Sequence, residues 1–125
     1  MLISAAMVGA GTACFSDHGQ IAAPNGAVCQ IPLDPSLLGS TVVAIENFTF
    51  IPAQVTIGSG ARVTWINCDV GNEDHTSTAD QGAWDSSLLT AGPPSALFTF
   101  TFTSAGTFSY HCTPHPTMQG SVVVQ

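Results

Sequence analysis

The chain has 125 residues, a length that favours one domain with one hydrophobic core. Hydrophobic residues make up 45% of it, which argues against disorder. Charged residues make up only 7%: eight are acidic, Arg62 is the only residue that is either lysine or arginine, and the formal net charge is −7. Because phosphate binding needs Lys and Arg, this balance argues against nucleic acid and anionic lipid headgroups as partners. A basic protein partner remains compatible with it.

Residues 1–39 are predicted to be an extension ahead of the main domain. Residues 1–13 are too short for a membrane span and resemble the apolar region of a secretion signal; the alternative is an ordinary strand or helix. They lead into Cys14 in a partial match to a bacterial lipoprotein cleavage site, with Gly11 where leucine is usual. The stretch 14–40 shows no period and is interpreted as loop-like. We expect an extracytoplasmic protein of the bacterial periplasm, with a lipid anchor at Cys14 as a further expectation.

From residue 40 onward, strand signals become regular. Short β-branched or alternating segments are separated by Gly- and Ser-containing turns, with no helix-length periodic segment between them. Val63 and Trp65 share one strand face, and so do Phe98, Phe100 and Phe102. The expected strands are 41–45, 48–50, 54–57, 62–67, 95–103, 107–112 and 121–124. The pattern predicts an all-β domain over residues 40–125, with short strands forming an antiparallel sandwich.

The most informative segment is 112–118, which reads CTPHPTM and follows an expected strand. A site that cycles between Cu(II) and Cu(I) needs mixed ligands, because soft sulfur favours Cu(I) whereas imidazole suits both states. Electron-transfer copper sites use two histidines and one cysteine in a plane, with a weak axial methionine. The segment supplies Cys112, His115 and Met118, so a second histidine must come from elsewhere.

Three histidines compete for that fourth position. His111 is adjacent to Cys112, and neighbours in a strand point to opposite faces. His18 lies in the loop-like extension. His75 follows the strand expected at 62–67, and a sandwich can bring its loop beside Cys112. We therefore predict His75 as the second histidine ligand.

These features resemble the cupredoxins of the plastocyanin and amicyanin kind. The similarity covers residues 40–125 and includes Phe50-Ile51-Pro52, the strand 63–67, the His75 loop and the segment 106–120. The Cys-x-x-His-x-x-Met spacing is that of the short amicyanin-type loop; plastocyanins have two more residues before the methionine. The resemblance implies a cupredoxin-like Greek-key β-sandwich, one mononuclear type 1 copper and outer-sphere electron transfer without catalysis. The extension, the long loop at 69–74 and the absence of lysine depart from the family and bear on the partner.

Two other classes of function compete with electron transfer. A copper carrier or storage protein, the main alternative, would favour several Met or His sites, but the three methionines are not clustered. A copper redox enzyme would need a second copper site, which His18 and His111 do not make. We expect a blue copper protein, most simply a monomer, that shuttles single electrons between redox protein partners, with a basic cytochrome as one candidate.

The surroundings of the expected site can also be predicted. Thr76 and Thr113 are candidate hydrogen-bond donors to the ligands. His115 should lie nearest the surface because its loop caps one end of the sandwich. The apolar ring expected around it consists of Ala91, Pro93, Pro94, Pro114, Pro116 and Met118.

Assigning Cys112 to copper leaves three cysteines, an odd number. In an oxidising compartment two of them should pair. Cys14–Cys29 would close a short loop, whereas Cys29–Cys68 would close a longer one and leave Cys14 for a lipid. The chain-entropy model gives more stabilisation for the longer loop, so we favour Cys29–Cys68.

Overall fold

The computed structural model describes residues 20–22, 28–30, 39–69, 71–91 and 96–125. Within these ranges the chain forms strands and no helix, so the all-β prediction is confirmed. The strands are β1 (Gln20–Ala22), β2 (Val28–Gln30), β3 (Ser40–Glu46), β4 (Thr49–Ile51), β5 (Gln54–Ile57), β6 (Arg62–Asn67), β7 (Thr78–Ala79), β8 (Leu97–Thr101), β9 (Gly106–His111) and β10 (Gln119–Val124). No helix in the described part of the chain is long and apolar enough to cross a membrane.

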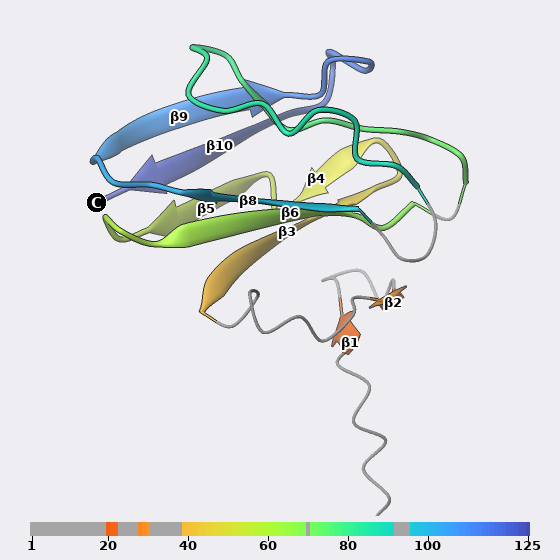
Figure 1. The fold of residues 1–125 in the computed structure, drawn as a ribbon, viewed down its shortest axis with the longest axis horizontal. Coiled ribbons are helices and arrows are strands. Elements are labelled where there is room, and N and C mark those ends of the chain that lie inside the picture. The colour runs from red at the N-terminus through yellow and green to blue at the C-terminus, as the bar shows by residue number, and fades with distance from the viewer. Residues whose placement is uncertain (1–19, 23–27, 31–38, 70, 92–95) are drawn as a thin grey trace, which may run out of the picture.

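Two four-stranded sheets face each other and form the sandwich (Figure 1). Their strand orders are β5-β10-β9-β7 and β4-β3-β6-β8. Two pairings, β3 with β6 and β5 with β10, are parallel, so the expectation of a purely antiparallel sandwich was wrong. The reason is the crossover: after the β3–β4 pair, β5 joins the opposite sheet, and β6 returns beside β3 in the same direction.

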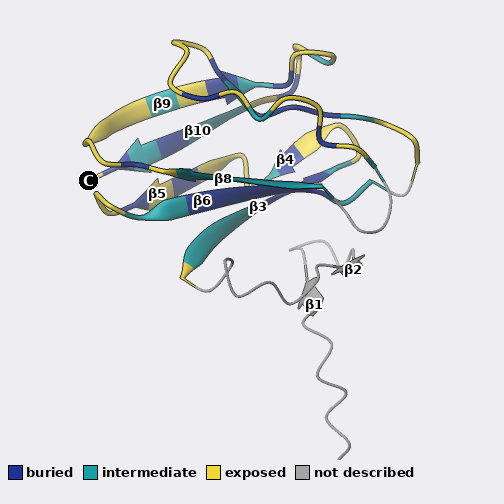
Figure 2. Cartoon of the chain, viewed as in Figure 1, coloured by how far each residue is buried: buried dark blue, intermediate teal, exposed yellow. Residues whose placement is uncertain are grey.

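The core lies between the sheets, where the side chains are buried (Figure 2). Trp65 is fully buried and stacks on Trp84 with ring centroids 5.3 Å apart. Phe98 and Phe100 pack against this core and Phe102 is part of it, which confirms their shared face. Trp84, whose role the sequence left open, is a core residue whose indole N–H donates to the Ser77 hydroxyl at 2.9 Å.

The structure differs from the sequence expectations at three places. Phe48, expected to begin a strand, lies in the β3–β4 turn with φ of 56°, after Asn47 with φ of 49°. β7 was not expected, because its two residues are too few to show a period. The segment predicted to be loop-like contains β1 and β2, which pair antiparallel.

Candidate metal centre

The loop that joins β9 to β10 carries three of the four predicted ligands. Cys112 directly follows β9, and Met118 directly precedes β10. The loop is closed by its own backbone: the amide of His115 donates to the carbonyl of Cys112 at 3.2 Å, and that of Met118 to His115 at 2.9 Å. The amide of Cys112 donates in turn to the carbonyl of Met118 at 3.1 Å. These bonds hold the loop in a compact shape at one end of the sandwich.

The side chains of His75, Cys112 and His115 converge on one point. One donor atom from each lies within 4.8 Å of the others, and the Cys112 Sγ is 3.7 Å from the Nδ1 of each histidine. A first-row metal at about 2.3 Å from sulfur and about 2.0–2.1 Å from nitrogen places such donors roughly 3.8 Å apart in a trigonal plane. The donor spacing therefore fits a metal ion held in the plane of the three ligands.

The chemistry of these donors selects copper among the first-row metals. One thiolate and two imidazoles form the trigonal set typical of electron-transfer copper sites. Met118, which is 3% exposed, lies in the same buried cluster as Cys112 and belongs to the same short loop. A thioether there can supply the weak axial ligand that this kind of site uses.

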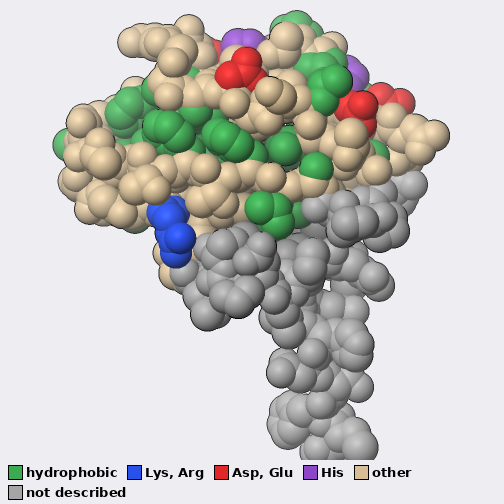
Figure 3. All heavy atoms as spheres, in the orientation of Figure 1, with side chains coloured by type: hydrophobic (Ala, Val, Ile, Leu, Met, Phe, Trp, Pro, Cys, Tyr) green, Lys and Arg blue, Asp and Glu red, His purple; other side chains and the backbone are tan. Residues whose placement is uncertain are grey.

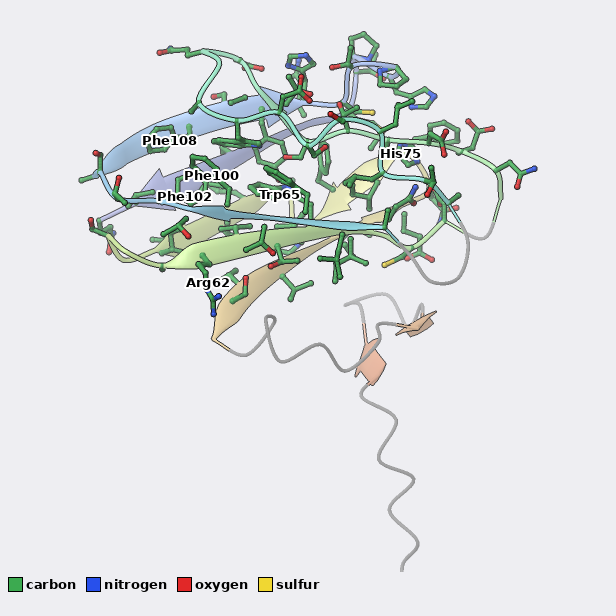
Figure 4. All side chains as sticks on the ribbon, in the orientation of Figure 1. Arg62, Trp65, His75, Phe100, Phe102 and Phe108 are labelled. Atoms are coloured by element: carbon green, nitrogen blue, oxygen red, sulfur yellow. The ribbon has the colours of Figure 1, made fainter. Side chains whose placement is uncertain are left out.

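His75 is fixed by the loop that follows β6. Its backbone exchanges two hydrogen bonds with Leu89, of 3.2 and 2.7 Å. The buried side-chain amide of Asn67 donates to the carbonyls of Glu73 and Leu89, at 2.9 and 2.8 Å, and so connects both sides of this loop to β6. The His75 ring is fully buried, and its Nε2 lies 2.6 Å from the Asp69 carboxylate. Figure 4 shows His75 at the end of the sandwich opposite to Arg62.

The sulfur of Cys112 accepts one backbone hydrogen bond. The amide of Thr76 lies 3.4 Å from Sγ, as expected of a donor to the thiolate. The Thr113 amide does not bond the sulfur itself; it donates to the hydroxyl of Thr76 at 2.8 Å and so supports the residue that does. The Thr76 amide therefore helps to fix the position of the Cys112 sulfur, as hydrogen-bond partners of metal ligands do.

Of the two remaining histidine candidates, His111 is the one that the structure describes, and it does not join the cluster. His111 points away from Cys112, as predicted, and its Nδ1 lies 2.6 Å from the exposed Asp80 carboxylate. His18 lies outside the described residues.

The expected apolar ring around His115 is only partly present. The His115 side chain is 26% exposed against 0% for His75, so it lies nearer the surface as expected. Pro114 and Pro116 are exposed, and Ala91 is half-buried. Met118 is buried, so its place in the ring was wrong: it packs inward beside Cys112. Pro93 and Pro94 lie outside the described residues.

Phe48 is a site residue that the sequence did not reveal. Its ring stands edge-on to His115, with centroids 4.8 Å apart, and to His75, at 5.6 Å. It is 49% exposed, and so forms part of the surface beside both histidines. The signal that could have placed it is Asn47, since Asn tolerates positive φ and marks a turn. The contact of the Phe48 ring with the two histidines depends on the fold and cannot be predicted from the sequence.

The charge around the site is negative. Asp69 touches His75, and the Glu73 carboxylate is 3.8 Å from His115 Nε2. Arg62, the only basic residue apart from histidine, begins β6 at the far end, where Figure 3 shows it in blue. The copper end of the molecule therefore carries carboxylates without a nearby arginine or lysine.

The fold and the donor set define a β-sandwich with a mononuclear copper site, and comparisons with known proteins agree. Residues 38–125 match the model of the copper binding proteins of the plastocyanin/azurin family. The amicyanin of Paracoccus versutus is 31% identical over 102 residues, 79% of this chain and 71% of that protein. Amicyanin-alpha of Methylorubrum extorquens is 33% identical over 119 residues, 93% of this chain and 94% of that protein. A structure of the reduced Cu(I) form of an amicyanin variant at pH 4 superposes with a TM-score of 0.61 at 33% identity, covering 70% of this chain and 83% of that one.

The chain belongs to the plastocyanin/azurin family of copper binding proteins and is a cupredoxin of the amicyanin and plastocyanin kind. Members of this family generally carry electrons and are not enzymes. Copper is the cofactor that the family and the donor set both indicate.

Proposed function

We propose that this protein carries single electrons by cycling one type 1 copper between Cu(II) and Cu(I), held by His75, Cys112, His115 and Met118. The observation that carries the proposal is the convergence of one sulfur and two imidazole nitrogens within 4.8 Å of one another at one end of the sandwich. Bound copper supplies the one-electron redox chemistry. The chain supplies a fixed set of donors, and the burial of three of the four ligands keeps water from them.

Visible absorption of the Cu(II)-loaded protein tests the ligand set. Thiolate-to-copper charge transfer should give an intense band that a reductant bleaches reversibly. Cys112→Ser should abolish the band, and His115→Ala should weaken or shift it. His111→Ala is the matched control, because His111 is also next to the cysteine but points away, and it should leave the band unchanged. A colourless wild-type protein would refute the proposal.

The rate of copper release separates an electron carrier from a copper carrier or storage protein. Release needs ligands that move, whereas Cys112, His75 and Met118 are at most 3% exposed. We expect copper to stay bound in both oxidation states in the presence of a mild chelator. Rapid loss of Cu(I) to such a chelator would favour transport or storage.

The partner is proposed to be a redox protein with a positively charged docking surface, such as a basic cytochrome. Glu73 lies beside His115, and the molecule has a formal net charge of −7. His115, the most exposed copper ligand, would be the point of electron entry and exit. We further propose that the carrier is a monomer. We place it in an extracytoplasmic compartment, the bacterial periplasm, and cell fractionation tests this location directly.

The division at residue 40 and the cysteine pairing remain proposals. Cys112 is the free cysteine among the described side chains, and Cys68 follows β6 at the copper end. A Cys29–Cys68 disulfide would tie the extension to this end and leave Cys14 for a lipid. Peptide mapping without reduction tests it: a Cys14–Cys29 peptide would disprove the pairing, and an unmodified Cys14 in the mature protein would disprove the anchor.

A further inference from the structure

The carboxylate of Asp69 is placed between the buried histidine and the β3–β4 turn. Its Oδ2 is 2.6 Å from the Nε2 of His75, and its Oδ1 accepts the backbone N–H of Asn47 at 2.7 Å. The Asp69 side chain is 12% exposed and the His75 side chain is not exposed at all, so water weakens their contact little. Each oxygen of one carboxylate therefore has a separate function.

We propose that Asp69 is a positioning residue of the copper site, which fixes His75 in one tautomer and increases its donor strength. A carboxylate only accepts hydrogen bonds, so the proton of a neutral His75 ring must lie on Nε2. Nδ1, which faces the Cys112 sulfur at 3.7 Å, then keeps its lone pair free for the metal. The inference rests on the proposed role of His75 as a ligand.

The consequence concerns the balance between the two oxidation states. A histidine that donates to a carboxylate becomes a more basic ligand, and a more basic ligand stabilises the more highly charged ion. Asp69 should therefore favour Cu(II) and lower the reduction potential. Among the described residues His115 has no such partner: its Nε2 is 3.8 Å from Glu73, beyond hydrogen-bonding distance.

The second oxygen of Asp69 holds the turn that covers the site. Asn47 and Phe48 both have positive φ, a conformation that non-glycine residues adopt only when it is stabilised. The Asn47 amide bonded to Asp69 is one such stabilising contact, and Phe48 next to it reaches both histidine rings. One carboxylate thus orients a ligand and holds its aromatic cover.

Two measurements test the inference. The first is the ¹⁵N NMR spectrum of His75 in the metal-free wild-type protein, where we expect a proton on Nε2 and none on Nδ1. The second compares Asp69→Asn with Glu73→Gln in the copper-loaded protein. Both variants remove one negative charge near a ligand histidine. Asp69→Asn also removes one of the two acceptor oxygens that bond His75 and Asn47. Glu73→Gln removes no hydrogen bond to His115, because Glu73 makes none.

Loss of an outer partner of this kind typically costs about 10- to 100-fold in metal affinity. We expect Asp69→Asn to lose Cu(II) affinity in this range and Cu(I) affinity less. Each tenfold of differential loss raises a one-electron potential by about 59 mV. Glu73→Gln should change the potential by much less, because its carboxylate is 52% exposed.

The inference is overturned if the metal-free His75 ring carries its proton on Nδ1 or exchanges between tautomers. It is also overturned if both variants shift the potential equally. Failure of this inference can be distinguished from failure of the proposed function. A wild-type protein without a charge-transfer band would refute the copper site. The NMR tautomer of the metal-free protein would still test the role of Asp69.

Discussion

Tyr110 lies where β9 enters the core, and its hydroxyl is poorly satisfied. The side chain is 1% exposed, and neither its hydroxyl nor the Trp65 indole N–H has a hydrogen-bond partner among the described residues. Burial raises the pKa of Tyr110 from 10.0 to about 12, and the nearby Trp65 indole opposes part of this rise without reaching hydrogen-bonding geometry. The folded protein therefore disfavours the ionised phenol.

This raised pKa predicts a loss of stability at alkaline pH. Because the unfolded chain releases the Tyr110 proton near pH 10 and the folded one near pH 12, the contribution is complete below pH 10 and disappears between these values. Two pKa units correspond to about 3 kcal/mol as an order of magnitude. Urea unfolding of the metal-free protein at several pH values measures it, and Tyr110→Phe should remove most of the slope. An equal slope in both proteins would contradict the assignment.

Phe48 should protect the copper ligands from exchange. An edge-on ring contact is worth about 0.5–1.5 kcal/mol, so loss of the contact with the exposed ligand His115 in Phe48→Ala should speed Cu(II) loss to a strong chelator by roughly 2- to 10-fold. Leu88→Ala is the control, because Leu88 is the other large exposed apolar side chain among the described residues. Equal rates for the two variants would show that Phe48 does not shield the site.

At the scale of the elements, β9 and β10 approach closely where Tyr110 pairs with Gly120. A Cβ on Gly120 would overlap the phenol ring of Tyr110, so only glycine fits beside that ring. Gly120→Ala should lower the free energy of unfolding by about 1–3 kcal/mol. Gly58→Ala, where a Cβ meets nothing within 4 Å, should change it by less than about 0.5 kcal/mol. Urea unfolding of both metal-free variants provides the comparison, and equal midpoints would contradict this packing.

The sequence predicted the long strands and missed features that depend on contacts between elements. β3, β5, β6, β8, β9 and β10 were predicted because short β-branched or alternating segments between turns mark strands. Cys112, His115 and Met118 were predicted because they share one short loop. The contact of Asp69 with His75 and the contacts of Phe48 with the two histidine rings could not be predicted from the sequence, since neither leaves a local pattern. The parallel pairing of β3 with β6 likewise depends on which sheet β5 joins.

At the scale of the whole molecule, charge is distributed unevenly along the sandwich. Glu73 and Asp69 lie at the copper end, and Arg62 begins β6 at the other. Electron exchange with a cationic partner should therefore slow as salt rises, because ions screen the attraction. Glu73→Gln should weaken this salt dependence more than Asp80→Asn, which removes the same charge beside His111 instead. Stopped-flow rates at several salt concentrations measure both, and rates independent of salt would contradict electrostatic docking.

If the protein is an electron carrier, one copper ion should keep the same ligands in both oxidation states. X-ray absorption at the copper edge, on the oxidised and the reduced protein near neutral pH, tests it most directly. We expect one short sulfur and two nitrogen ligands in each state, with only small changes in distance, because the buried donors are held by the backbone. A spectrum without a short sulfur, or loss of both histidine nitrogens on reduction, would contradict it.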